Sequence, residues 1–274
     1  MKDALRNLIT LRYFAPSLSE RLFFIFGCQR SGTTLLLSIL SAHPNIVGTD
    51  ETEFASPYPF PSAQRLAFHR LTGKYACFKM LEHSNKLDFL TTFYPNAKVL
   101  WPIRNPYSTL SSMLNLTNAK GSWINRCAKL ELKRIRPFFP EVFANLQISD
   151  LSAIEKASLY WACKNQYPAL LQAQGFPVLV FQYENLLEDQ KNTLTSIVKF
   201  LGLDWSDDLL NFYQKNPGKS LAGGTRTNLP INRDRASQLQ SHFSQADVER
   251  IQQICEPVMK TYGYTMPEMY DRSS

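Results

Sequence analysis

The sequence of 274 residues lacks the features that mark several large classes of protein. It has no apolar run long enough to cross a membrane, since the longest near its start covers only residues 22–28. Its 5 cysteines are odd in number and none are spaced as CxxC, so we expect neither a disulfide framework nor a zinc ribbon. The motifs HExxH and GxSxG are absent. The 11 glycines and 16 prolines show no period, which excludes collagen-like and low-complexity chains.

The composition is that of a folded domain. Apolar residues make up 44% and charged residues 19% of the chain, which is enough to bury a sizeable core. We expect one domain over residues 1–274, with residues 1–19 as an N-terminal extension or helix. Arg6, Asn7 and Arg12 interrupt the stretch that a secretory signal would need, and reduced thiols fit a cytoplasmic location. The net charge of +7 favours an anionic ligand, an acidic surface or nucleic acid, without choosing among them.

Predicted strands and helices alternate along the chain. Short apolar runs predict buried strands at residues 22–26, 46–49, 75–80, 97–103 and 177–181. Helical spacing predicts helices at residues 35–40, 87–93, 152–174, 194–201 and 245–262. Asn105 followed by Pro106 predicts the start of another helix. The order predicts a P-loop-like three-layer α/β fold, in which helices flank a central, mostly parallel sheet and ligands bind at the carboxyl ends of the strands.

The segment GCQRSGTT at residues 27–34 follows the first predicted strand and opens a helix. It matches the phosphate-binding Walker A loop, GxxxxGK[ST], except that Thr33 stands where the lysine should be. That lysine reaches the β- and γ-phosphates of a nucleoside triphosphate, so this loop suits a ligand with a shorter 5′ group. The strand at 97–103 ends in Arg104, not in the aspartate that holds Mg²⁺ in nucleoside triphosphatases. We therefore expect an anion site that requires no metal.

Two motifs together resemble the sulfotransferases that use 3′-phosphoadenylyl sulfate (PAPS). The run RSGTTL at 30–35 resembles their 5′-phosphosulfate loop, and IRNP at 103–106, with Ser112 eight residues after Arg104, resembles their 3′-phosphate-binding segment. The stretch 30–52, with AHP at 42–44 and DET at 50–52, is most similar to the tyrosylprotein sulfotransferase branch and its bacterial relatives. The similarity continues through Lys79 and more weakly to residues 205–207, so it covers most of the chain.

The resemblance implies a function and a set of site residues. It implies a PAPS-dependent sulfotransferase that moves a sulfuryl group to a hydroxyl acceptor by in-line transfer with a carboxylate base. Glu51 is the implied base, and Arg30 and Lys79 are the residues that would stabilise the transition state. The implied PAPS-binding residues are Gln29, Arg30, Ser31, Gly32, Thr33, Thr34, Arg104, Ser112 and Tyr183.

The chain departs from the tyrosylprotein branch at one phosphate contact. That branch has an arginine four residues after the serine, where this chain has Leu116. Arg226, in a cofactor-proximal loop expected at residues 216–235, is the candidate replacement. The acceptor is not readable from these motifs. A carbohydrate, a lipid, a small molecule and a peptide tyrosine are all open.

Alternatives remain for the base and for the function. Asp50, Glu53, His69 or His83 could replace Glu51 as the base. A P-loop small-molecule kinase and a catalytically inactive nucleotide-binding protein of the same fold are the alternatives to a sulfotransferase. No nucleic-acid partner is expected, because only the net charge and the basic cluster at residues 133–136 favour one.

Overall fold

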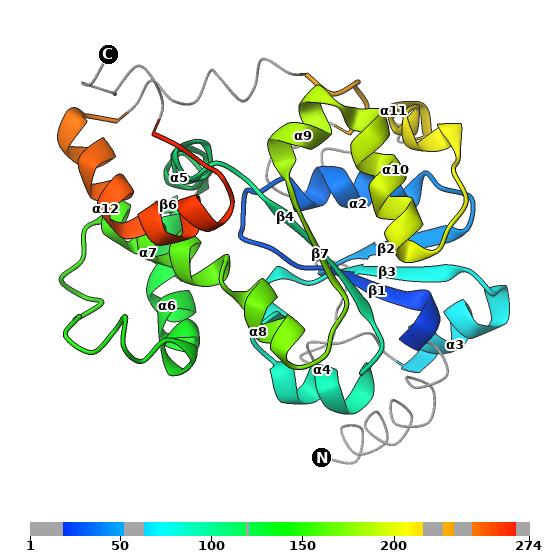
Figure 1. Ribbon diagram of the computed structural model, residues 1–274, viewed down its shortest axis with the longest axis horizontal. Helices are drawn as coiled ribbons and strands as arrows, with labels where there is room; N and C mark the ends of the chain where they lie inside the picture. The colour runs from blue at the N-terminus through cyan, green and yellow to red at the C-terminus, as the bar shows by residue number, and fades with distance from the viewer. Residues whose placement is uncertain (1–18, 52–62, 119–120, 216–226, 233–242, 267–274) are drawn as a thin grey trace.

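The centre of the fold is a parallel sheet of five strands (Figure 1). The computed structural model describes residues 19–51, 63–118, 121–215, 227–232 and 243–266. The strands of the sheet are β1 (Leu22–Ile25), β2 (Ile46–Asp50), β3 (Tyr75–Lys79), β4 (Lys98–Ile103) and β7 (Val178–Gln182). They lie in the order β2-β3-β1-β4-β7, and every neighbouring pair is parallel. The predicted α/β fold is confirmed.

Helices connect the strands and cover both faces of the sheet. The α-helices are α2 (Thr33–Ser41), α3 (Ala63–Thr72), α4 (Leu87–Phe93), α5 (Pro106–Leu114), α6 (Lys129–Ile135), α7 (Ala153–Lys164), α8 (Tyr167–Ala173), α9 (Tyr183–Glu188), α10 (Gln190–Leu201), α11 (Phe212–Lys215) and α12 (Gln245–Thr261). Short 3₁₀ turns are η1 (Ser19–Arg21), η3 (Leu81–His83), η5 (Arg136–Phe138) and η6 (Asp207–Leu209), and η4 (Ile124–Ala128) is a π-helical turn. A separate antiparallel hairpin joins β5 (Thr117–Asn118) and β6 (Gly121–Ser122).

Each face of the sheet has its own hydrophobic core. Successive residues of a strand point to opposite faces, so Phe24 and Trp101 join one core and Phe23 and Leu100 join the other. The first core is closed by α4, α5, α6, α7, α8 and α12, and the second by α2, α9, α10 and α11. Figure 1 shows α2, α9, α10 and α11 together on one side of the sheet. This two-sided cover explains why the central strands read as continuous apolar runs.

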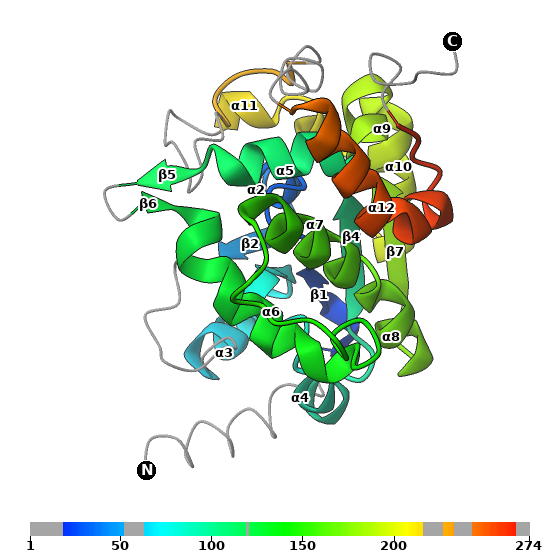
Figure 2. The same ribbon diagram turned by 90° about the vertical axis from the view of Figure 1, so that its left-hand side faces the viewer.

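Helix α7 is anchored at its start by a capping box and an ion pair. Ser152 and Glu155 form a capping box at its start, and Arg250 of α12 pairs with Glu155 at 2.6 Å. The helix packs against α5, α6 and α12 (Figure 2). Its carboxyl end therefore has a well-defined position beneath the end of the sheet that carries the site described below.

Two predictions about regular structure were wrong in detail. The long helix expected over residues 152–174 is split into α7 and α8, with a break at Asn165 and Gln166. Pro168 explains the break, because it has no N–H to donate to the carbonyl of Lys164 and its ring clashes with that carbonyl. The strand predicted at 177–181 is only partly buried, because β7 lies at the edge of the sheet.

Candidate functional site

The predicted site residues gather at the carboxyl ends of the parallel strands. The loop 27–34 follows β1, Asp50 and Glu51 lie at the end of β2, and Lys79 ends β3. Arg104 follows β4, and Tyr183 follows β7. The register brings these ends level, since Lys79 is opposite both Ile25 of β1 and Asp50 of β2. Segments far apart in the sequence thus meet at the carboxyl ends of the strands, as predicted.

The loop after β1 holds its shape through its own backbone. Ser31 donates from both its N–H (3.3 Å) and its hydroxyl (2.7 Å) to the carbonyl of Cys28. Arg30 has a φ of 70°, a left-handed conformation that is uncommon outside glycine. Gly32, at a φ of 86°, precedes α2, and no side chain caps the first N–H groups of that helix. The start of α2 therefore offers backbone donors and a positive dipole end to an anion.

Two arginines converge on this loop. Arg30 donates from Nε to the hydroxyl of Ser112 at 2.8 Å, which joins the loop to α5. Arg104 donates from Nη1 to the carbonyl of Arg30 at 3.2 Å, and its guanidinium lies 5.1 Å from the ring centroid of Tyr183. Burial, followed by the nearby charge of Arg104, lowers the pKa of Arg30. The two cations together repel each other, so an anion bound between them would be stabilised.

Residues that the sequence did not reveal hold Arg104 in place. The indole of Trp161 in α7 donates to the carbonyl of Arg104 at 3.0 Å. Glu184 accepts from the N–H of Asn105 at 2.9 Å and from the hydroxyl of Tyr264 at 2.8 Å. These contacts join residues that are 57 to 80 positions apart in the sequence. No local pattern indicates them, because they depend on how α7, α9 and the segment after α12 pack.

Lys79 forms a buried ion pair. Its Nζ lies 2.5 Å from Oδ2 of Asp50, and the side chains of the pair are 4% and 5% exposed. The same Nζ donates to the hydroxyl of Thr34, on the first turn of α2, at 3.2 Å. The lysine thereby joins the phosphate loop to the ends of β2 and β3. Asp50, considered in the sequence as an alternative base, is the counter-ion of this lysine.

Glu51 is the other carboxylate at the end of β2. Its Oε2 accepts a hydrogen bond from the backbone N–H of Leu81 at 2.8 Å. Burial raises the pKa of Glu51, and the negative charges of Asp50 and Glu82 add to this, while Lys79 and the Leu81 N–H act in the opposite direction. A carboxylate whose pKa lies closer to neutrality is a more effective general base.

One further observation is consistent with a ligand at the loop, and a second explains why position 32 is a glycine. Oε1 of Gln29 is buried and has no hydrogen-bond partner among the described residues. Buried polar atoms in folded proteins are usually paired, and a ligand or water would supply the missing group. A Cβ at position 32 would overlap the ring of Tyr183, so only glycine leaves room there.

The remaining candidates are not part of this group. His69, on α3, packs edge-on against the ring of Phe78 at 5.5 Å between centroids and is buried away from the loop. Glu53, Arg226 and the side chain of His83 lie outside the described residues. Over the described ranges, no three His, Cys, Asp or Glu side chains converge to hold a metal ion. In the same ranges, every helix is too short or too polar to cross a bilayer.

Known proteins resemble this chain in sequence and in fold. A chicken relative, protein-tyrosine sulfotransferase 2, is 23% identical over 89% of this chain and 69% of its own length. The sulfotransferase domain from the curacin biosynthetic pathway superposes with a TM-score of 0.56 at 17% identity, covering 89% of this chain and 98% of that domain. A mouse sulfotransferase complexed with PAP superposes with a TM-score of 0.52 at 16% identity, covering 91% of this chain and 90% of that one.

The family itself is established by a sequence profile. The profile described as "Sulfotransferase family" matches residues 23–67 and 60–207, which together include the five strands of the sheet except the first residue of β1. The matched residues include Arg30, Glu51, Lys79 and Arg104. The uncapped start of α2, two converging arginines and a buried lysine, all at the carboxyl ends of the strands, agree with this match. The chain belongs to the sulfotransferase family, enzymes of the EC 2.8.2 type.

Proposed function

We propose that this protein transfers a sulfuryl group from PAPS to a hydroxyl acceptor, with Glu51 as the general base. The observation that carries the proposal is the grouping of three cations, Arg30, Arg104 and Lys79, around the uncapped start of α2, with the carboxylate of Glu51 beside them. The mouse sulfotransferase complexed with PAP, adenosine 3′,5′-bisphosphate, supports PAPS as the donor.

The residues around the loop fit a nucleotide that carries an anion at each end of its ribose. The backbone N–H groups of the loop, Arg30 and the hydroxyls of Thr33 and Thr34 would hold the 5′ phosphosulfate. Arg104 and Ser112 would hold the 3′-phosphate. Ser112 already accepts a hydrogen bond from Arg30, and its hydroxyl hydrogen remains available as a donor. The unpartnered Oε1 of Gln29 is consistent with this assignment, and Gly32 allows the ring of Tyr183 to lie against the loop.

In the proposed reaction, the protein's side chains would stabilise the developing negative charge and accept one proton. Bound PAPS supplies the sulfuryl group. The acceptor oxygen forms a bond to the sulfur while the bond between the sulfur and the phosphate oxygen breaks. Arg30 and Lys79 would neutralise the negative charge that grows on the phosphate and sulfuryl oxygens. Asp50 holds Lys79 at a fixed position, so this charge needs no rearrangement during the reaction. Glu51 would accept the proton of the acceptor hydroxyl.

The counter-charges in this proposal are side-chain cations. Two arginines and one lysine supply the positive charge around this loop, whereas nucleoside triphosphatases use a lysine and Mg²⁺. We therefore propose that transfer requires no metal ion. An assay in the presence of a chelator measures this directly: full activity supports the proposal, and activity that returns only with added Mg²⁺ contradicts it.

Calorimetry tests the identity of the donor. The wild type should bind adenosine 3′,5′-bisphosphate more tightly than ATP, and equal or tighter binding of ATP would contradict the proposal. Arg104→Ala should weaken the bisphosphate by about tenfold or more while leaving adenosine 5′-monophosphate little changed, because a charge-assisted hydrogen bond is worth about 1.5–3 kcal/mol. Arg21→Ala, which removes an arginine that donates to the carbonyl of Gly73 at the amino end of β1, is the matched control. Transfer itself is measured with labelled PAPS and a panel of hydroxyl acceptors.

A further inference from the structure

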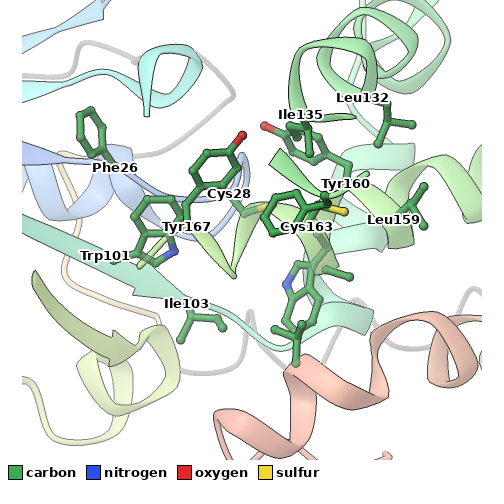
Figure 3. Close-up of a cluster of buried hydrophobic side chains, with 14 of the residues drawn as sticks. Phe26, Cys28, Trp101, Ile103, Leu132, Ile135, Leu159, Tyr160, Cys163 and Tyr167 are labelled. Carbon is green, nitrogen blue, oxygen red and sulfur yellow. The ribbon is translucent and has the colours of Figure 1, made fainter. Parts of the chain in front are cut away.

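Lys164, the last residue of α7, carries a buried ammonium group. Only 1% of its surface is exposed, although lysine is rarely buried to this extent without a specific partner. Its Nζ donates to the carbonyl oxygen of Leu81 at 2.6 Å and lies 5.5 Å and 6.0 Å from the ring centroids of Tyr167 and Tyr160. Figure 3 shows the hydroxyls of these tyrosines pointing toward each other within the core. The rings shield the ammonium group from water, and one backbone carbonyl holds it.

Leu81 links this ammonium group to the proposed base. The carbonyl of Leu81 accepts from Lys164, and the N–H of the same residue donates to Oε2 of Glu51 at 2.8 Å. Leu81 begins the turn η3 directly after β3, and its side chain is buried. Because one residue carries both hydrogen bonds, the position of the Glu51 carboxylate depends on where Lys164 holds the turn.

One face of α7 fastens both halves of the site. Trp161 and Lys164 are three residues apart and so lie on the same side of the helix. Trp161 donates a hydrogen bond to the carbonyl of Arg104, which belongs to the proposed PAPS-binding part of the site. Lys164 donates one to the carbonyl of Leu81, next to the proposed base Glu51. The capping box and the Arg250 pair fix α7 itself. The helix can therefore set the distance between the donor and the base.

The charges around the two groups favour an attraction between them. The titratable groups that act on Lys164 are Glu131 of α6, Cys28 after β1, Glu51 after β2 and Glu82 of η3. The attraction between Lys164 and Glu51 is mutual, and Lys79 of β3, Asp50 of β2 and Glu82 also act on Glu51. Burial lowers the pKa of Lys164 to about 8, while the attraction of the carboxylates, that of Glu131 first, opposes the change. At neutral pH the lysine is therefore mostly charged.

We propose that Lys164 is a positioning residue for the base: it holds the Glu51 carboxylate in place through Leu81, and its positive charge favours the ionised form of that carboxylate. The inference rests on the proposed function of Glu51. A buried charge is costly, and an apolar side chain of similar length would fill the space more cheaply. A role next to the base accounts for a lysine at this position.

The test measures the pKa of the Glu51 carboxyl without any substrate. Protein labelled with ¹³C at the glutamate carboxyl carbons is titrated by NMR, and Glu51→Gln identifies the resonance of Glu51. In K164M the pKa of Glu51 should rise by roughly half a unit or more, because the variant loses a nearby positive charge and the anchor of the Leu81 turn. K164R, which keeps a charge and a donor, should restore most of the wild-type value.

Lys98 provides a matched control. Its Nζ also donates to a backbone carbonyl, that of Leu201 at 2.9 Å, and lies 5.8 Å from the ring centroid of Phe200. It begins β4, at the end of the sheet opposite to the site. K98M therefore removes the same kind of interaction and should leave the pKa of Glu51 unchanged. If K164M does not fold, K164Q, which retains a donor without the charge, carries the same comparison.

Activity adds a second readout. In K164M the kcat should fall by about tenfold to a hundredfold, the acid limb of the pH profile should move to higher pH, and the affinity for adenosine 3′,5′-bisphosphate should stay within about twofold. A pKa of Glu51 that is the same in K164M and wild type overturns the inference, whatever happens to activity. If the wild type transfers no sulfuryl group but the pKa of Glu51 still rises in K164M, the proposed function fails and the coupling of Lys164 to Glu51 stands.

Discussion

The buried ammonium group of Lys164 should leave a signature in the pH dependence of stability. Its pKa is about 8 in the folded protein and 10.5 in the unfolded chain, because burial penalises the charged form. Below pH 8 both states carry the proton, and the full cost of burying the charge is present. Between about pH 8 and 10.5 the unfolded chain binds more protons than the folded one, so the free energy of unfolding gains from rising pH. One pKa unit corresponds to about 1.4 kcal/mol, so the recovery over this window is on the order of 3 kcal/mol.

Comparing wild type with K164M isolates this contribution, because other titrating groups are common to both proteins. Urea unfolding, followed by the fluorescence of the 4 tryptophans at several pH values from 7 to 10.5, gives the two free energies. As the pH rises, the free energy of unfolding of the wild type should increase relative to that of K164M, by at most about 1.4 kcal/mol per pH unit. K164R is the control, since arginine keeps its proton throughout this range and its difference from K164M should be flat. A flat difference between wild type and K164M would show that Lys164 is not desolvated, and the reasoning would be wrong.

Three other predictions concern the site. Glu51→Gln should lower kcat by about 10²–10⁴-fold while calorimetry shows unchanged affinity for the bisphosphate. In the wild type, activity should fall as the pH drops through the pKa of Glu51, which burial raises above its ordinary value of 4.5. Gly32→Ala should weaken binding of the bisphosphate by about tenfold or more, because the added methyl group would overlap the ring of Tyr183. Gly175→Ala, also at a φ of 86° but with no neighbour within 4 Å, should leave binding unchanged, and equal losses in the two variants would contradict this steric explanation. Asp50→Asn should cost about 3–5 kcal/mol in urea unfolding, because it leaves the ammonium of Lys79 buried without its counter-ion, and a loss below about 1 kcal/mol would show that water reaches the pair.

The fold was largely predictable from the sequence because its signals are local. Continuous apolar runs predicted the strands of a sheet that is covered on both faces, and Asn105 with Pro106 predicted the start of α5, where the asparagine side chain does accept from the first N–H groups. The helix predicted over residues 152–174 was wrong because the apolar spacing continues across Pro168. The partial exposure of β7 could not be predicted, since an edge position depends on the order of strands in space.

The candidate site, like the fold, was predictable in some respects and not in others. The segments containing Arg30, Glu51, Lys79 and Arg104 were predicted together because parallel strands end at the same edge of a sheet, and the family resemblance supplied their roles. The pairings between side chains were not predictable. Ser112 was expected to contact a phosphate with Arg104, and it accepts a hydrogen bond from Arg30. Lys164 gave no signal either, because a lysine at the end of an amphipathic helix is normally exposed and only the packing of α7 buries it.

The two adjacent carboxylates at the end of β2 have different surroundings, and this difference favours Glu51 over Asp50 as the base. Asp50 pairs with Lys79 in a buried contact, so a proton on Asp50 would leave a lysine charge without its partner in a region where unpaired charge is expensive. Glu51 accepts a single backbone hydrogen bond on Oε2, and its other oxygen has no hydrogen-bond partner among the described residues. Burial also makes a proton on Glu51 easier to accept. A base must take up and release a proton in each turnover without dismantling its surroundings, and of these two side chains only Glu51 meets that condition.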